Sequence, residues 1–468
     1  MKEQRENKII KSINPLIILA AIVVIAAVAT YIVPAGVFDR VENTATGYDI
    51  VNPSSFHYVE NTPIGIFDLF KSITLGLQGA GNIIFFLLII GGVFQIVEAT
   101  GALHAGISNL VKKTAGKQLL LIPLCMAVFS LVSATAACSE EYLAFVPLVY
   151  VVCVACGFDS ITAVAILFCS SAVGYAGGMT NAFTVGVAQN ISEIPLFSGI
   201  GMRTAIFTVL VIITIIYVMI HARNVKINPQ KNVMYELDHK YADQIDFSEI
   251  VKITKRQKGV LLIFALGFIA VAISVIKLGF YIDEMSAIFV IIGMLCAIVG
   301  GLSLNDTADA FVEGCKNLIW AGLIIGFCKA ATNIMSDANI MDTLISSMAS
   351  VLKGLPSQVS ACGMFIIQDL FNFIVPSGSG QAAITMPFMA PLADLLGLTR
   401  QVAVLAFQLG DAFTNVITPT SGSLMAALAI CHIPYKSWIK FMLPLWGMWC
   451  IVACAFLIYA STIGYMGY

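Results

Sequence analysis

Residues 133–147 read SATAACSEEYLAFVP, a small polar stretch with two adjacent carboxylates inside an otherwise apolar part of the chain. The runs on either side, 118–132 and 142–156, are apolar, and each is shorter than the roughly 20 residues that cross a bilayer with ease. Two short apolar arms with a polar tip predict a re-entrant hairpin over 118–156. Unpaired backbone at that depth needs protein or water around it, so we expect the tip to line a polar cavity. Ser133 and Thr135 of the tip are candidate binding residues.

The composition places this hairpin in a membrane protein. Of 468 residues, 59% are hydrophobic and 11% are charged, whereas soluble proteins carry about 25% charged residues. The mean hydropathy is +0.92. Seven apolar runs approach or exceed the length of a membrane span: 14–33, 82–98, 204–220, 259–276, 285–302, 317–335 and 441–460. The sequence therefore predicts an all-α polytopic membrane protein. It contains no P-loop pattern and no basic nucleic-acid patch.

Basic residues orient the spans. The N-terminus and the polar stretch 221–258 are rich in Lys and Arg, so both are expected in the cytoplasm, with the spans in the plasma membrane. The acid-leaning segment 35–62 is expected outside, with short strands. Arg203 begins a span and is interpreted as an interfacial anchor. The lone pair Cys153 and Cys156 is interpreted as small buried hydrophobes, because no further metal ligands stand near it.

A weak repeat divides the chain at the cytoplasmic linker 223–258. Residues 139–180 align without gaps with 379–420, and the matches include Ser139 with Ser379, Pro147 with Pro387 and Gly157 with Gly397. Upstream, GAGNIIFFLLIIGG (79–92) is similar to GCKNLIWAGLIIGF (314–327). If the predicted spans are counted from a cytoplasmic N-terminus, these two similar segments cross the membrane in opposite directions. Inverted-topology repeats are therefore predicted over 1–222 and 259–468, an arrangement common in secondary transporters.

Each predicted repeat holds a hairpin followed by a broken helix. The second hairpin is expected over 358–396, with the tip VPSGSGQ (375–381). The broken helices are expected over 160–200, interrupted by GYAGGMTNAFT (174–184), and over 400–430, interrupted by GDAFTNVITPTSGS (410–423). Gly and Pro are common in membrane helices. Two such interruptions at corresponding positions, each rich in Thr, Asn or Ser, indicate a binding site, because broken helices free N–H and C=O groups.

The carboxylates of the first tip need an explanation. Ser139 in an N-cap position would put Glu140 and Glu141 in a first helical turn, where the helix dipole stabilises them by roughly 0.3–1 kcal/mol. A charge near the bilayer centre costs about 2.5 kcal/mol or more. The glutamates are therefore expected to be hydrated and to meet a cation, to be protonated, or to pair with a base. Asp411 in the second interruption is interpreted in the same way. Lys329, within a predicted span, either pairs with an acid or attracts a carboxylate.

The stretches CSEEYLAFVPL, VPSGSGQAAITMPFMAPLADLLGLTRQVAVLAFQLGD and NVITPTSGSLMAAL resemble the YfcC-type branch of the four-carbon dicarboxylate anaerobic carrier (DcuC-like) family, within the ion-transporter superfamily. The resemblance covers nearly the whole chain. It implies a homodimer with a scaffold domain and an elevator-type transport domain. The site residues that it implies are Ser139, Glu140, Glu141, Thr180, Asn181, Ser377, Ser379, Gln381, Asp411, Asn415, Thr418, Thr420 and Ser421.

Relatives within this resemblance differ in substrate: some carry dicarboxylates and others resemble arginine/ornithine exchangers. Two glutamates at the tip would repel a doubly charged anion and would favour an added amino or guanidinium group. We therefore expect a secondary active transporter of a basic amino acid, working by exchange or ion-coupled uptake. No cofactor or certain metal is expected, and sodium at the tips or a proton is the candidate coupling ion.

The sequence leaves three other functions as alternatives. The first is a sodium- or proton-coupled four-carbon dicarboxylate transporter. The second is a channel, for which two asymmetric hairpins would be an unusual pore. The third is an intramembrane hydrolase with Ser379 as nucleophile, which lacks a histidine placed to act as its base. No enzyme is expected.

Overall fold

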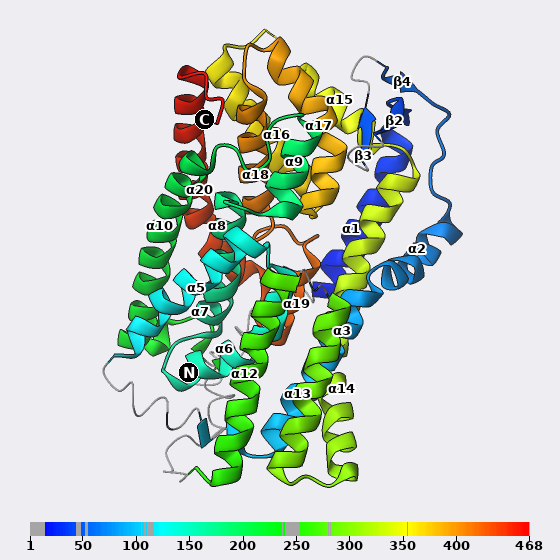
Figure 1. Ribbon diagram of the computed structural model, residues 1–468. Helices are drawn as coiled ribbons and strands as arrows, with labels where there is room; N and C mark the ends of the chain where they lie inside the picture. Colours follow the sequence, from blue (N-terminus) through cyan, green and yellow to red (C-terminus); the bar gives the residue numbers. More distant parts are fainter. Residues whose placement is uncertain are drawn as a thin grey trace, which may run out of the picture.

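The computed structural model is nearly all helical in the residues that it describes (Figure 1). These are residues 15–43, 48–51, 55–103, 105–106, 109, 117–235, 237–238, 253–278, 280, 282–352 and 354–467. The helices form two groups that pack side by side, and the largest buried apolar core contains residues of both groups.

The first group, called the α14 group, is arranged around the long helix α14. It comprises α1 (Pro15–Ile32), α2 (Ile66–Gly79), α3 (Gly81–Ala99), α12 (Lys255–Leu278), α13 (Ile282–Gly300) and α14 (Leu304–Asp337). Glycines allow its closest contact: a Cβ on Gly91 of α3 would lie 2.6 Å from the Gly314 carbonyl oxygen of α14, and one on Gly314 would lie 2.1 Å from that of Gly91. Small residues let membrane helices approach in this way.

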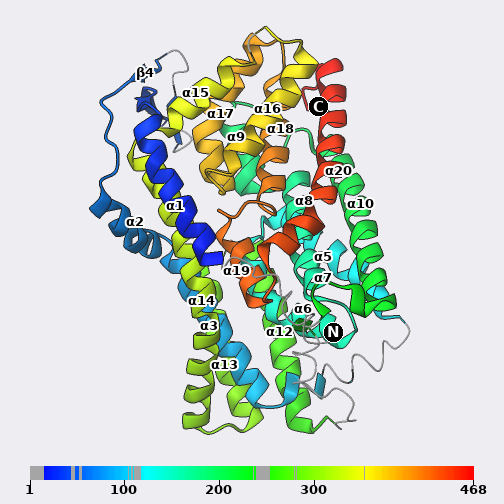
Figure 2. The ribbon, with the colours of Figure 1, turned by 180° about the vertical axis from the view of Figure 1, so that it is seen from behind.

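The second group, called the α18 group, surrounds α18, whose residues from Gln401 to Thr414 are all buried. It comprises α5 (Leu121–Ala136), α6 (Val146–Ala155), α7 (Ser160–Val164), α8 (Ser170–Gly177), α9 (Val187–Ile191), α10 (Ile200–Ile227), α16 (Ser357–Asn372), α17 (Gly378–Leu395), α18 (Arg400–Thr414), α19 (Gly422–Ile430) and α20 (Tyr435–Thr462). Helices α10 and α20 run along the outer side of this group in both views (Figures 1 and 2).

Short strands connect α1 to α2, as expected for segment 35–62. β1 (Gly36–Val37) pairs with β4 (His57–Tyr58), and β2 (Arg40–Asn43) pairs with β3 (Tyr48–Val51), both antiparallel. This segment contacts α15 (Met341–Ser350), where the Phe38 N–H donates to Asp342 Oδ2 at 3.1 Å. The sequence did not predict α15 or the amphipathic helix α2, because both are shorter than a span.

Seven helices in the described ranges are long and apolar enough to cross a membrane. They are Gly81–Ala99, Gln118–Thr135, Ser160–Gly177, Ile200–Ile227, Ile282–Gly300, Leu304–Asp337 and Tyr435–Thr462. Five overlap expected spans, but two lie in segments that were predicted to be a hairpin arm and part of a broken helix. The expected spans 14–33 and 259–276 form α1 and α12, which fall outside this set. The crossing count behind the inverted repeat thus stays a prediction.

The interpretation of Arg203 as an interfacial anchor is wrong. Its side chain is buried near the start of α10, where Nη1 donates to the Ser198 carbonyl at 2.6 Å and Nη2 to the Phe197 carbonyl at 3.0 Å. The guanidinium therefore binds the backbone of the turn before α10. Cys153 and Cys156 are buried free thiols, as expected.

Candidate functional site

The first polar tip connects α5 to the 3-10 helix η3 (Glu140–Phe145), which leads into α6. α5 ends where Ala137 takes a left-handed conformation (φ 61°). As expected, Ser139 takes the N-cap position of η3 and puts Glu140 and Glu141 in the first turn, but its side chain makes no capping bond. Its N–H instead donates to Glu141 Oε2 at 2.8 Å. Glu141 is buried, and its carboxylate turns back to hold the tip.

Side-chain hydroxyls stabilise this tip from within. Ser133 Oγ donates to the Cys138 carbonyl and lies 3.1 Å from the Tyr142 hydroxyl. Tyr175 of α8 donates to the Ala137 carbonyl. Thr135 bonds its own helix, donating to the Leu131 carbonyl at 2.8 Å. Ser133 and Thr135 therefore hold backbone carbonyls in place.

The second polar tip connects α16 to α17 and is built differently. Ser377 caps α17, accepting from the Gly380 N–H at 3.4 Å. Behind the tip, Asn372 Nδ2 donates both to Gln381 Oε1 at 2.9 Å and to Asp411 Oδ1 at 3.0 Å. Gln381 Nε2 donates in turn to the Gln368 side-chain oxygen at 2.8 Å. Gln381 and Asp411 thus belong to a buried amide–carboxylate network.

The two interruptions after the hairpins are also present. α8 ends at the left-handed Gly178, and Asn181 Oδ1 accepts from the Thr184 N–H at 3.0 Å, while Thr180 is exposed. Between α18 and α19, Asn415 Nδ2 donates to the Asp411 carbonyl at 2.8 Å.

Two threonines fix the second interruption against the second tip. The hydroxyls of Thr418 and Thr420 are 2.6 Å apart, and Thr420 donates to the Phe373 carbonyl at 2.7 Å. Phe373 directly follows α16, so this bond ties the broken helix to the hairpin.

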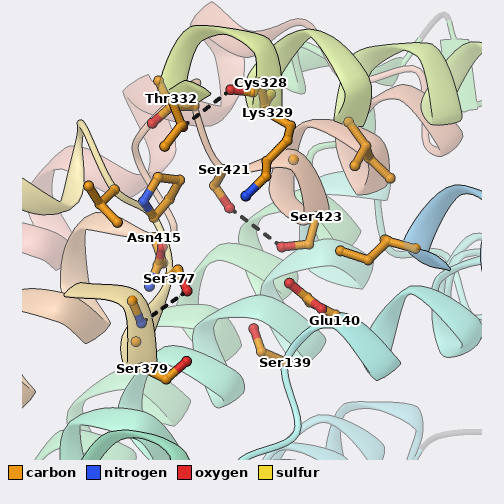
Figure 3. Close-up of a pocket in the computed structure, with 18 of the residues that line it drawn as sticks. Ser139, Glu140, Cys328, Lys329, Thr332, Ser377, Ser379, Asn415, Ser421 and Ser423 are labelled. Carbon is orange, nitrogen blue, oxygen red and sulfur yellow. Dashed lines mark hydrogen bonds between the residues drawn. The ribbon is translucent and has the colours of Figure 1, made fainter. Parts of the chain in front are cut away.

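Both tips and the second interruption open onto one cavity of about 490 Å³ between the two helix groups (Figure 3). Eight of the expected site residues line it: Ser139, Glu140, Glu141, Ser377, Ser379, Asn415, Thr420 and Ser421. Seven do not: Ser133, Thr135, Thr180, Asn181, Gln381, Asp411 and Thr418. Asp411 lies just behind the wall, because a Cβ on Gly378 would be 3.2 Å from its Oδ2.

The α14 group supplies the other wall, which was missing from the expected site. Its polar residues are Lys329, Thr332, Asn333 and Ser336. Their spacing places them on one face of α14, but only the three-dimensional contact of α14 with the broken helix turns that face toward the tips. Ser423, Ser171, Tyr175 and Thr184 of the α18 group also line the cavity and were not predicted.

The charged groups on the described cavity wall are Glu140, Glu141 and Lys329. Figure 3 shows Lys329 reaching toward Ser421 and Ser423, with Glu140 on the far side. A wall with charges of both signs and many hydroxyls suits a small ligand that itself carries both signs. In the described residues, no group of three His, Cys, Asp or Glu side chains could hold a metal ion. The carboxylate and hydroxyl oxygens of the tips are of the type that hard cations prefer.

Comparisons with known proteins agree with a transporter. A family model described as C4-dicarboxylate anaerobic carrier matches residues 14–462. The chain is 34% identical over 489 aligned positions, 97% of each chain, to "Putative basic amino acid antiporter YfcC" of Escherichia coli (strain K12). It is 30% identical over 413 positions, 87% of this chain and 81% of the other, to an uncharacterized protein of Haemophilus influenzae.

Among solved structures, the chain aligns with Neisseria gonorrhoeae MtrF, which is from a class of antimetabolite efflux pumps. The alignment covers 97% of this chain and 96% of MtrF, with 19% identity and a TM-score of 0.43. With nearly its whole length matched, the chain belongs to the C4-dicarboxylate anaerobic carrier family.

Proposed function

We propose that this protein is a secondary active transporter that moves basic amino acids by alternating access, either in exchange for one another or coupled to an ion. The observation that carries the proposal is the cavity at which two polar tips and a broken helix meet, with Glu140 and Glu141 on its wall. Broken helices that face one polar cavity supply dipole ends and free carbonyls for a substrate and a coupling ion. The name of the Escherichia coli relative supports the substrate class.

The architecture suits movement of one helix group against the other. The α18 group carries both tips and both interruptions, and the α14 group supplies only the facing wall. We propose that the α18 group is the elevator-type transport domain and the α14 group the scaffold. The two hairpins would be re-entrant, and the two repeats inverted. The protein would act as a homodimer in the plasma membrane, with its N-terminus in the cytoplasm.

Four-carbon dicarboxylate transport is the second candidate. The family description and the ammonium of Lys329 favour it. The two glutamates oppose it, because a doubly charged anion would meet two like charges with one opposite charge to offset them. A serine hydrolase has less support, since no histidine is among the described residues that line the cavity with Ser379.

Exchange in proteoliposomes tests the proposal. Vesicles containing the purified protein and preloaded with ornithine are expected to take up labelled arginine faster than empty vesicles. A parallel series with succinate or malate on both sides tests the dicarboxylate reading. A sodium gradient and a pH gradient, imposed separately, identify the coupling ion. Uptake of dicarboxylate without uptake of arginine, ornithine or lysine would overturn the proposed substrate.

A further inference from the structure

Lys329 is a charged residue inside a buried segment of α14. Its neighbours Cys328, Ala330 and Ala331 are buried, while the Lys329 side chain is exposed into the cavity. Its stem runs beside Gly79 at the end of α2, where a Cβ would come 3.6 Å from Lys329 Cγ and Cε. The absence of a side chain at Gly79 leaves room for the lysine to extend along this wall.

The structure does not explain Lys329 as half of an internal ion pair. Figure 3 marks no hydrogen bond between its ammonium group and the other cavity residues drawn, and one turn to either side along α14 lie Ile325, Gly326, Thr332 and Asn333, none of them acidic. The cavity acids, Glu140 and Glu141, belong to η3 on the opposite group. An ammonium that faces an open cavity without a protein partner is available to a ligand.

The surroundings of the ammonium suit an anionic group. Lys329 extends toward Ser421 and Ser423 (Figure 3), whose hydroxyls are 3.5 Å apart. These serines stand at the start of the nine-residue helix α19, and Ser421 makes no side-chain capping bond there. The N-terminal N–H groups of a helix carry partial positive charge. Together with the ammonium, they form a wall that would accept a carboxylate.

The charges of the whole cavity then match one class of molecule. One ammonium and two carboxylates line the described wall. Arginine, lysine and ornithine carry the reverse set: one carboxylate, one α-ammonium and one side-chain cation. Lys329 lies on the α14 group and the glutamates on the α18 group, so such a ligand would bridge the two groups.

We propose that Lys329 binds the carboxylate of the substrate, so that the site selects cationic α-amino acids over the corresponding amines. This inference rests on the proposed function and adds to it the residue that recognises the carboxylate. A site of this kind binds arginine more tightly than agmatine and ornithine more tightly than putrescine, because the two members of each pair differ by one carboxylate.

Binding to the purified full-length protein in detergent tests this, with arginine and agmatine as probes in a thermal-shift titration. Wild type is expected to bind arginine about 10- to 100-fold more tightly than agmatine, the effect of one charge-assisted hydrogen bond. Lys329→Gln is expected to reduce arginine affinity to that for agmatine and to leave agmatine binding unchanged or tighter. Lys316→Gln, on the same helix but outside the cavity and paired with Glu313, is the matched control and should keep the wild-type ratio.

The possible outcomes distinguish a failure of the proposed role of Lys329 from a failure of the proposed transport function. Equal affinities of wild type for arginine and agmatine overturn the role of Lys329 without any variant, so a variant that fails to fold does not block the test. An unchanged ratio in Lys329→Gln overturns it as well, while leaving basic amino acid transport in place. Wild type that binds succinate or malate and no basic amino acid overturns the proposed function and, with it, the substrate class inferred here.

Discussion

The two polar tips have the same outline and different chemistry. The first tip presents carboxylates from a short 3-10 helix and passes through a left-handed alanine. The second presents serine hydroxyls and a capped helix N-terminus, and it is fastened from behind by the network of Asn372, Gln381 and Asp411. Related patterns in sequence therefore give two tips that bring different groups to the cavity: the first brings carboxylates, and the second brings hydroxyl and N–H groups.

The largest expected difference between the tips is in transport. Glu140→Gln and Glu141→Gln should each lower the kcat/KM of arginine uptake about 10- to 100-fold, because each removes a charged partner of a cationic substrate. Ser379→Ala on the second tip removes a neutral hydroxyl and should lower it by less than about 10-fold. Uptake by proteoliposomes containing equal amounts of protein gives the three values. Equal losses at both tips would contradict the expectation that the carboxylates of the first tip contribute more to transport than the hydroxyl of the second.

Each half also depends on one glycine where two helices cross. A Cβ on Gly174 of α8 would lie 2.4 Å from Ser133 Cβ in α5, and one on Gly410 of α18 would lie 2.6 Å from Gln368 Cβ in α16. Gly174→Ala and Gly410→Ala should each lower the free energy of unfolding by about 1–3 kcal/mol, since neither helix pair can absorb the methyl group without shifting.

Gly447→Ala in α20 is the control for these variants. No atom lies within 4 Å of the added Cβ, so its stability should stay near that of wild type. Thermal melts in detergent measure all three. A normal melting temperature for only one of the two crossing variants would show that the halves differ in rigidity as well as in chemistry.

The starts of the two broken helices differ in how they are capped. α18 is capped by its neighbour Thr399, which accepts from the Val402 N–H at 3.3 Å. The α7 N-terminus uses Asp159, which accepts from the Thr162 N–H at 2.9 Å, and also Asp238 of the linker, whose Oδ2 accepts from the Ser160 N–H at 3.0 Å. A hydrogen bond from the Ser160 N–H to the Asp238 carboxylate therefore connects the first broken helix to the linker.

This tie predicts a pH dependence. Burial raises the pKa of Asp238 to about 6, although its hydrogen bonds from Ser160 act in the opposite direction. The folded state thus binds a proton more tightly than the unfolded state. The contribution of Asp238 to stability should be largest below about pH 4, fall as pH rises to about 6 and stay constant above it, a change of about 3 kcal/mol.

Melting temperatures of wild type and Asp238→Asn between pH 4 and 8 measure this change. The difference between the two proteins includes the repulsion between Asp238 and the nearby Asp159, which pairs with His221 at 2.9 Å. The melting temperature of the variant should rise relative to that of wild type as pH rises toward 6. The asparagine amide keeps an oxygen that accepts a hydrogen bond, and it does not bury a charge as the ionised carboxylate does. A constant difference across this range would contradict the prediction.

The smallest expected effect concerns backbone strain. Ala137 has φ 61°, whereas no residue from Phe373 to Gln381 in the second tip has a positive φ. An L-residue pays roughly 1–2 kcal/mol for this conformation and glycine avoids it, although glycine loses more entropy on folding. Ala137→Gly should therefore stabilise the protein by up to about 1 kcal/mol in thermal melts. A loss of stability would show that the alanine methyl group has a packing role that outweighs the strain.

The sequence predicted the elements whose signals are local. The tips and interruptions were found because Gly, Pro, Ser and Thr cluster between apolar arms, and helices occupy both arms in each case. The seven site residues that miss the cavity, among them Gln381 and Asp411, were beyond such reasoning. A polar residue in a broken helix can face a ligand or bond its neighbours, and only packing decides which.

The lysine of the opposite wall shows the other limit. From the sequence, Lys329 could either pair with an acidic residue or attract a carboxylate ligand, because its partner depends on which helix α14 faces. The contact that decides is between α14 and α19, where Gly422 allows its backbone to approach Ile325: a Cβ there would lie 3.3 Å from Ile325 Cα. Such a contact joins segments nearly a hundred residues apart in the chain, with no periodic pattern to indicate it.

The length of α14 sets a further constraint. Its 34 residues, at roughly 1.5 Å each, extend about 51 Å, whereas the hydrocarbon layer is about 30 Å thick. Four of its charged residues, Asp306, Asp309, Glu313 and Lys316, lie in its first four turns. An α14 that stands perpendicular to the membrane would therefore extend its first four turns beyond the hydrocarbon layer into water. The remaining turns would hold Lys329 near mid-depth, so that a passing solute meets this ammonium about halfway across.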